Sequence, residues 1–357
     1  MQRILRQLRF CELRWGLALL MICHSQTLLA ATNPMIDLEE SAQDFVLNIK
    51  KIQIPGFPDA FNPSIIHWKG LILMSFRIIP DIKNSYTSQI GLIWLDEDFS
   101  PIGEPQILDT TLSPTTPSRT DDGRIIAVGD QIYLVYSDNT DPEISKGGFR
   151  VFVAKLSFDG GLFHVENPVK LSQFEGEIKG RREKNWVPFD YQGQLLLAYS
   201  LTPHVIFQPL LDIEACETVA RSASNWNWHW GEPRGGSPAL RVDDDYLAFF
   251  HSFVTIPTLH SDGRKMNHYF MGAYTFSATP PFPIKSVSPE PIVGLGFYKG
   301  PVYKPYWGSV RCVYPCGFIF NENFIWVSYG RQDHEVWIAK LDKKKLFDSL
   351  VPVATIK

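Results

Sequence analysis

The stretch PSRTDDGRII, residues 117–126, places two carboxylates beside an arginine where an apolar run begins. A carboxylic acid there can donate a proton to a leaving oxygen, and a guanidinium beside it can bind an anionic group. The Asp-Asp-Gly sequence is also typical of ordinary turns, in which Asp side chains bond the backbone. Asp121, Asp122 and Arg124 therefore indicate either a solvated turn or a reaction centre, and the surrounding elements must decide between them.

Short β-rich runs, separated by Gly, Asp, Asn or Pro, recur along the chain after residue 60. Five are apolar hairpins, and each is followed by a strand, a turn and a shorter extended segment. The hairpins are residues 64–77, 124–138, 186–200, 237–252 and 316–330. The segments that follow them are residues 90–108, 151–171, 205–220, 269–292 and 336–353.

This alternation predicts an all-β fold, a five-bladed β-propeller of four-stranded antiparallel blades over residues 55–357. A two-sheet sandwich with long loops is the alternative. The propeller is favoured because the repeat continues through the chain after residue 60 and leaves no second domain.

Loops on one face of a propeller gather around its axis, so residues distant in sequence meet there. Polar residues next to the predicted hairpins form a ring that combines carboxylates, cations and amides. Cations in it could bind an anionic nucleophile or substrate, and an acid could protonate a glycosidic oxygen. The ring consists of Asn62, Arg77, Asp121, Asp122, Arg124, Lys184, Asn185, Ser200, His204, Arg234, His251, Tyr329, Arg331 and Asp333.

Four motifs in order resemble glycoside hydrolase family 130, the β-mannoside phosphorylases and β-mannosidases with five-bladed propellers. TDDGRI (120–125) resembles the family's Glu-Asp-Pro-Arg motif, and EKNWVPF (183–189) is similar to its Lys-Asn segment. GGSPALRVDDDYLAFFHS (235–252) resembles its Gly-rich strand start and the hairpin that ends in His. YPCGFIFNENFIWVSYGRQDHEVWIAKL (314–341) is similar to its final blade, with Tyr-Gly and then Asp.

The resemblance covers roughly residues 55–341 and implies a role for each matched position. Asp122 matches the catalytic acid, which delivers its proton to the leaving oxygen through a sugar hydroxyl. Arg124, Lys184 and His251 fall on positions of the phosphate or mannosyl site, and Asp333 matches a carboxylate that holds sugar hydroxyls. Phosphate attacks with inversion in the phosphorylases, whereas the hydrolases use water and a carboxylate base.

Two departures from the family pattern leave the reaction open. Gly123 stands where the family has Pro, and this glycine gives the backbone more conformational freedom than proline would. YSLTPHVIF (199–207) stands where the phosphorylases have a His-Arg pair, and His204 could replace part of its function. Arg234 and Arg181–Arg182 could compensate for the rest, or they are simply exposed charges. Phosphorolysis, hydrolysis and transfer by a β-mannosyltransferase all remain, as does a glycan-binding propeller without catalysis.

The segment SNWNWHWGEPRGGSP, residues 224–238, alternates three tryptophans with polar residues. In an extended chain Trp226, Trp228 and Trp230 share one face, while the polar side chains share the other. Indoles on one face would suit stacking on sugar C–H surfaces. The alternative is a loop packed over a blade edge.

The composition of the chain limits which classes of ligand and partner are expected. A formal net charge of −4 gives no general attraction to nucleic acid, and 13% aromatic residues are compatible with a glycan ligand. We expect no cofactor, with inorganic phosphate as an optional co-substrate. His251, His260 and His268 lack a metal-ligand spacing motif, so no metal is expected.

The first 31 residues carry four arginines before a short apolar stretch that ends at Ala30–Ala31. This order predicts a secretory signal, or alternatively an uncleaved membrane anchor, before an N-terminal extension at residues 32–54. The protein is therefore expected to be exported, with membrane contact only through an uncleaved segment. Export would permit a bridge between Cys312 and Cys316, although two ordinary thiols are favoured.

Overall fold

The computed structural model describes residues 35–81, 87–111, 119–139, 148–178, 180–302 and 308–355. All the sheets lie in the unit that begins at Asp37. The predicted signal or anchor at residues 1–31 lies outside the described residues. Within the described ranges, no helix is both long and apolar enough to cross a membrane.

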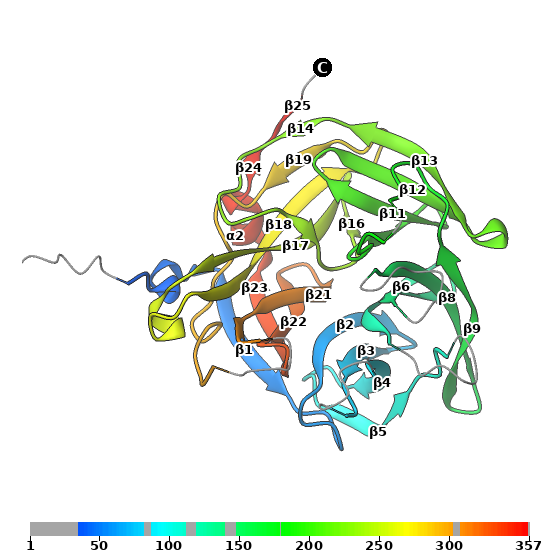
Figure 1. Ribbon diagram of the computed structural model, residues 1–357, viewed down its shortest axis with the longest axis horizontal. Coiled ribbons are helices and arrows are strands. Elements are labelled where there is room, and N and C mark those ends of the chain that lie inside the picture. Colours follow the sequence, from blue (N-terminus) through cyan, green and yellow to red (C-terminus); the bar gives the residue numbers. More distant parts are fainter. Residues whose placement is uncertain are drawn as a thin grey trace, which may run out of the picture. The chain divides into compact units, whose positions relative to one another are not determined.

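Four sheets have the up-and-down layout of a propeller blade, with four antiparallel strands each (Figure 1). The first three follow chain order, and the last is completed by the N-terminal strand. The first blade contains β2 (Phe61–Trp68), β3 (Leu71–Ile78), β4 (Gln89–Leu95) and β5 (Pro101–Ile107). The second contains β6 (Asp121–Val128), β7 (Gln131–Asp138), β8 (Arg150–Asp159) and β9 (Leu162–Leu171). The third contains β10 (Val187–Tyr191), β11 (Gln194–Leu201), β12 (His204–Leu210) and β13 (Ala215–Ser222).

The last blade shows how the ring of blades is closed. It contains β21 (Val313–Phe320), β22 (Phe324–Arg331), β23 (Glu335–Asp342) and β1 (Val46–Ile52). Strand β1 pairs with β23 in antiparallel register, from Val46 opposite Leu341 to Ile52 opposite Val336. Within the predicted extension at residues 32–54, Val46–Ile52 form the outer strand of this blade.

A seven-stranded sheet stands where a fifth four-stranded blade was predicted, so the prediction of five such blades is wrong. In it β17 and β18 are twelve residues long, and β17 is long enough to pair with two short strands, β15 and β16. Ser237 and Pro238 interrupt what would otherwise be one inner strand. The members are β15 (Arg234–Gly235), β16 (Leu240–Val242), β17 (Asp245–Ile256), β18 (Met266–Ser277), β19 (Ile284–Val287), β20 (Val310–Arg311) and β24 (Val351–Pro352).

The C-terminal segment also differs from the prediction of a strand, a turn and an extended segment at 336–353. After β23 the chain forms helix α2 (Lys343–Ser349), because the Asp342 carboxylate accepts from the Lys345 backbone N–H at 2.9 Å. Beyond β24, β25 (Ala354–Thr355) pairs with β14 (Ser224–Asn225). Short 3₁₀ helices lie at η1 (Leu38–Ser41), η2 (Leu211–Ile213) and η3 (Leu259–Ser261).

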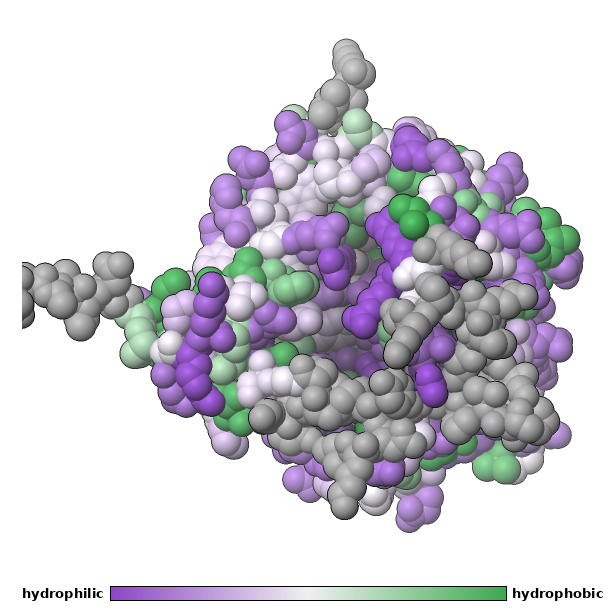
Figure 2. Space-filling model, viewed as in Figure 1, coloured by the Kyte–Doolittle hydropathy of each residue, from purple (hydrophilic) through white to green (hydrophobic). Residues whose placement is uncertain are grey.

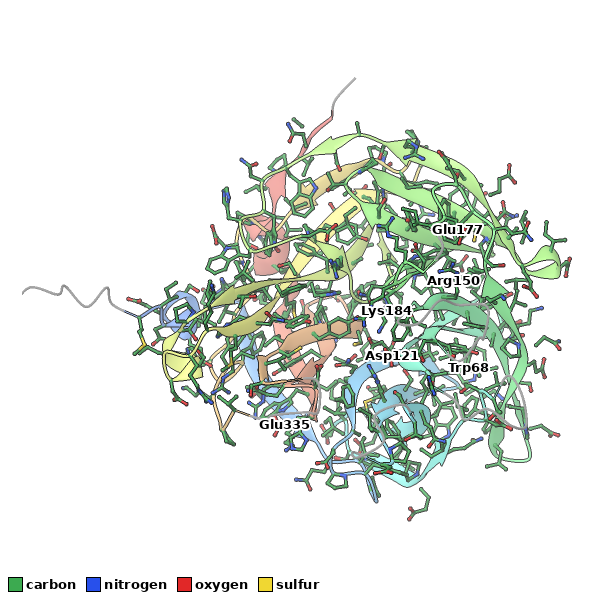
Figure 3. All side chains as sticks on the ribbon, in the orientation of Figure 1. Trp68, Asp121, Arg150, Glu177, Lys184 and Glu335 are labelled. Carbon is green, nitrogen blue, oxygen red and sulfur yellow. The ribbon has the colours of Figure 1, made fainter. Side chains whose placement is uncertain are left out.

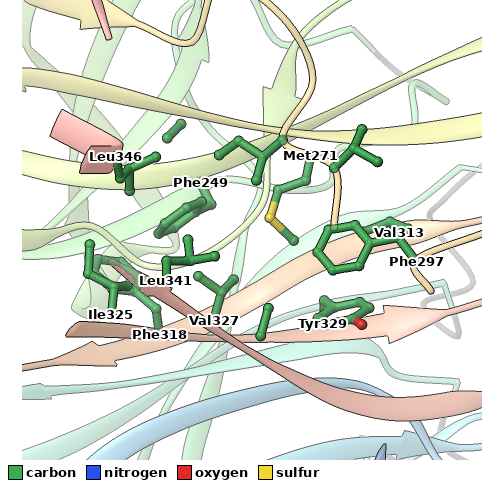
Figure 4. Packing of buried hydrophobic residues seen from close by; sticks show 14 of the residues in the cluster. Phe249, Met271, Phe297, Val313, Phe318, Ile325, Val327, Tyr329, Leu341 and Leu346 are labelled. Carbon is green, nitrogen blue, oxygen red and sulfur yellow. The ribbon is translucent and has the colours of Figure 1, made fainter. Parts of the chain in front are cut away.

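The core between the last blade and the seven-stranded sheet is apolar and tightly packed (Figure 4). Phe249 of β17 and Phe318 of β21 meet edge to face, with ring centroids 5.1 Å apart. Met271 of β18 and Leu346 of α2 belong to the same cluster. This core fixes β17 and β18 against β21, the inner strand of the last blade.

Candidate active site

Each of the first three blades places a polar residue with a left-handed backbone where its innermost strand begins. The φ angles are 49° at Asn62, 52° at Asp122 and 65° at Asn185. Asn and Asp adopt this region more readily than other side chains, although it is uncommon outside Gly. Bulges in β2 and β6 accompany the first two, and a bulge re-aims the side chain that it carries. The repeated geometry directs three polar side chains into one place.

Gly123, where the sequence departs from the family motif, does not supply this backbone freedom. Its φ is not positive, and a Cβ there would lie 2.7 Å from Ile90 Cδ1 and 3.0 Å from Leu134 Cδ1. Its carbonyl oxygen accepts from the Ser75 hydroxyl at 2.6 Å. Gly123 is therefore required by close packing, and the left-handed residue is Asp122.

The Asp122 carboxylate is enclosed by polar donors. Its Oδ1 accepts from Asn62 Nδ2 at 2.8 Å and from Arg77 Nη1 at 3.2 Å. Burial acts to raise its pKa, but the charges of Arg77 and Lys184 and the bond from Asn62 outweigh burial and lower the pKa to about 2. Without a ligand, Asp122 is therefore an anion at neutral pH.

Asp121 neutralises the same cations. Its Oδ1 lies 2.5 Å from Arg77 Nη2, and its Oδ2 accepts from Lys184 Nζ. The Lys184 ammonium also lies 3.6 Å from the centre of the Phe149 ring. Figure 3 shows Asp121 and Lys184 together between the second and third blades. The two carboxylates and two cations form one network.

Arg124 is a buried structural hub, which corrects its assignment to ligand charge. Its side chain donates to the carbonyl oxygens of Gly236 and Asp122, to Asn185 Oδ1 and to the Tyr314 hydroxyl. The residue is only 2% exposed. These partners belong to four different sheets or their strand starts, so Arg124 ties the inner ends of the sheets together.

His251 reaches the same network through Tyr314. The two rings lie 4.5 Å apart, and His251 Nδ1 lies 3.0 Å from the Gly235 carbonyl oxygen. Because a carbonyl only accepts, Nδ1 carries the proton. Burial, followed by the charges of Arg124 and Arg234, lowers the His251 pKa to about 3, so the imidazole is neutral. Arg234 is exposed, pairs with Glu232 at 2.8 Å and lies at the rim beside His251.

Asp333 belongs to the same region. It has φ 51° in the turn after β22. Burial is the main cause that raises the pKa of both the Cys312 and Cys316 thiols, and Asp333 and Asp122 both contribute to each. The two carboxylates therefore act on shared neighbours. Both cysteines are buried and free, without a bridge.

His204 and Tyr329 do not join this network, which corrects their assignment to substrate or phosphate binding. His204 is fully buried, lies 4.9 Å from the Phe276 ring and bonds the Phe282 carbonyl oxygen at 2.7 Å. Tyr329 is fully buried in the core and packs on Phe297, with ring centroids 5.0 Å apart. Both side chains stabilise packing between sheets.

The three tryptophans alternate with exposed polar residues as predicted, but the indoles face the protein. Trp228 lies 4.8 Å from Phe250 and donates to Ser252 Oγ at 2.7 Å. Trp230 packs on Phe270, and Trp226 packs on Phe250. The predicted sugar-stacking role is corrected accordingly, because apolar contacts of the seven-stranded sheet occupy these rings.

Within the described ranges, no cluster of three or more His, Cys, Asp or Glu side chains could hold a metal ion. Sequence reasoning missed Tyr314, which lies at the centre of the network. The signal was weak, since a Tyr at the start of an apolar strand resembles an ordinary core residue.

Fold and site together define a propeller-like protein with a carboxylate held among cations at the inner ends of its blades. Hydrophilic side chains gather around a hollow near the middle of the face seen in Figure 2. No family model and no curated protein matches the sequence. The likeness is to solved structures.

One such structure comes from the glycoside hydrolase family 130 of mannoside phosphorylases, described with hydrolases that target β-1,2-mannosidic linkages in Candida mannan. It has a TM-score of 0.59 at 14% identity, over 92% of this chain and 95% of its own. A β-1,2-mannobiose phosphorylase from Listeria innocua has 0.54 at 14%, over 89% and 97%. A GDP-Man-dependent mannosyltransferase from Leishmania mexicana has 0.55 at 11%, over 84% and 91%. The resemblance to family 130 is thus confirmed at the level of the fold.

Proposed function

We propose that this protein is a carbohydrate-active enzyme that cleaves β-mannosidic or related glycan linkages with inversion, with Asp122 as proton donor. The observation that carries the proposal is the Asp122 carboxylate, held by Asn62 and Arg77 where β6 begins. Arg124, His251 and Asp333 surround the same place. Structures of this fold include a β-1,2-mannobiose phosphorylase and a GDP-Man-dependent mannosyltransferase, which supports the substrate class.

The nucleophile follows from the charges. Arg77 and Lys184, the cations whose charges lower the Asp122 pKa most, are both paired with Asp121, and a phosphate would have to compete with that carboxylate for them. This pairing favours an uncharged nucleophile, water in hydrolysis or a sugar hydroxyl in transfer.

We therefore expect free mannose as the main product from β-1,2-manno-oligosaccharides, whether or not phosphate is added. Chromatography of the products, with NMR of the newly formed anomer, measures both the product and inversion. Mannose 1-phosphate appearing only with phosphate would overturn the choice of nucleophile. Chain extension from GDP-mannose would identify a transferase, and binding without any turnover would identify a glycan-binding propeller.

The low pKa of Asp122 predicts an acid-side activity profile. A proton donor with a pKa of about 2 is protonated in a fraction that falls tenfold for each pH unit above that value. We expect kcat/KM to rise as pH is lowered from 8 to 5, by up to about tenfold per unit, without a plateau. A kcat/KM value that is independent of pH or increases with pH would exclude Asp122 as the proton donor in the free protein.

A further inference from the structure

The hairpin β17–β18 is longer than the blade strands beside it. Its two strands pair without interruption from Asp245 opposite Ser277 to Ile256 opposite Met266. Phe249 and Met271 pack in the apolar core, and beyond His251 the hairpin continues towards the turn at η3, with Val254 and Ile256 still packed against that core. Strand β20 pairs with the outer part of β18 at Asn267 and His268 and holds it in place.

One face of this outer part carries side chains suited to sugars. Because side chains alternate along a strand, His251, Phe253 and Thr255 share the face that Phe249 begins. Their partners across the ladder are Met271, Tyr269 and Asn267, which lie on the same face. The face therefore changes from apolar core to His251, then to two aromatic rings, and then to a hydroxyl–amide pair.

The two aromatic rings are half-buried and adjacent. Phe253 and Tyr269 stack with centroids 5.1 Å apart and an angle of 26° between their planes. The Arg234 guanidinium lies 5.7 Å from the Phe253 ring, at the rim. Beyond them, Thr255 Oγ1 donates to Asn267 Oδ1 at 2.6 Å in an exposed position. Aromatic carbon next to amide and hydroxyl groups is the chemistry that recognises the C–H faces and hydroxyls of sugars.

This face adjoins the Asp122 network. Tyr269 packs against the cluster of Cys312, Tyr314 and Cys316, and Tyr314 bonds Arg124. Burial is the main cause that raises the pKa of the Tyr269 hydroxyl, and Asp333 and Asp122 are close enough to contribute. The hairpin therefore forms a wall that begins at the proposed reaction centre and extends outward from it.

We propose that Phe253 and Tyr269, with Thr255 and Asn267 at the rim, form a subsite for the sugars on the leaving side of the cleaved bond. The inference rests on the proposed function and assigns the part of the glycan that the wall holds. A chain whose terminal unit reaches Asp122 passes this wall as it leaves, so longer chains make more contacts with it. The stacking role predicted for the three tryptophans is thereby assigned to other aromatic residues.

The test compares oligosaccharide substrates of two lengths, with variants made in the full-length protein. In Phe253→Leu and Tyr269→Leu, we expect kcat/KM for β-1,2-mannotetraose to fall about 3- to 10-fold, because an aromatic contact with the sugar is lost. We expect kcat/KM for β-1,2-mannobiose to fall less. Tyr269→Phe keeps the ring and is expected to retain most of the tetraose activity. Phe158→Leu, at a half-buried ring on β8 that packs on Trp94, is the matched control and should change neither substrate.

Equal losses for both lengths, or no loss for either, would overturn the subsite. Thermal unfolding of each variant shows whether a loss comes from misfolding. Titration of Asp122→Asn protein with the two oligosaccharides gives a second measure, in which Tyr269→Leu should weaken tetraose binding more than mannobiose binding. If the wild-type protein neither binds nor converts any mannoside, the proposed function itself has failed. Turnover with unchanged length dependence defeats only the subsite.

Discussion

Asp122→Asn is expected to lower kcat by about 10²- to 10⁴-fold, the range that a positioned general acid contributes. Asn has nearly the same shape as Asp. Its amide oxygen can still accept from Asn62 Nδ2, which lies 2.8 Å from Asp122 Oδ1 in the wild-type protein. The amide cannot deliver a proton at any relevant pH. The change also removes the anion that Arg77 faces 3.2 Å away, so that Arg77 keeps more of its positive charge free. Because the side chain keeps its shape but cannot deliver a proton, we expect sugar binding to persist while turnover is lost.

Steady-state kinetics on β-1,2-mannobiose, together with circular dichroism and ligand titration, measures this separation. Asp130→Asn is a suitable control because Asp130 is exposed in the turn between β6 and β7, at the end of β6 that is remote from Asp122. Activity within about tenfold of wild type in Asp122→Asn would exclude this residue as the proton donor. A loss of fold in the same variant would instead show that its role is structural, so folding must be measured first.

The strand pattern predicted the blades well where the hairpins are local. Hairpins at 64–77, 124–138 and 186–200 became the inner strands of three blades, because each carries its turn residues and apolar alternation within about fifteen residues. The larger sheet could not be predicted in this way. Its strands β20 and β24 join from distant parts of the chain, and the local pattern does not encode those pairings.

The site could be predicted as a set of positions but not as a set of roles. Asn62, Asp122 and Asn185 stand at equivalent strand starts, and the repeat in the sequence identifies such places. His204 lies at the start of β12 and Tyr329 near the end of β22, and packing against the neighbouring sheet buries both. Sequence spacing tells which end of a strand a residue occupies, but the neighbouring sheet decides whether its side chain faces the axis or the core.

Arg124 offers the sharpest test of that distinction, because its assignment changed from ligand charge to structural hub. If it were held for its charge, Arg124→Lys would preserve much of its function. In the structure, however, its guanidinium serves Gly236, Asn185 and Tyr314 at once. A single ammonium on a flexible stem cannot reproduce that fork of donors.

Arg124→Lys is therefore expected to lower the free energy of unfolding by about 2–4 kcal/mol, since it leaves buried acceptors unpaired while keeping a buried charge. Urea denaturation followed by fluorescence measures this change. Arg241→Lys, at an exposed arginine on β16 that donates to the Asp243 carbonyl, is the matched control, with an expected change within about 0.5 kcal/mol. Normal stability combined with lost activity in Arg124→Lys would restore the ligand role. Lost stability with activity retained in the folded fraction would establish that Arg124 acts on the fold and not on the substrate.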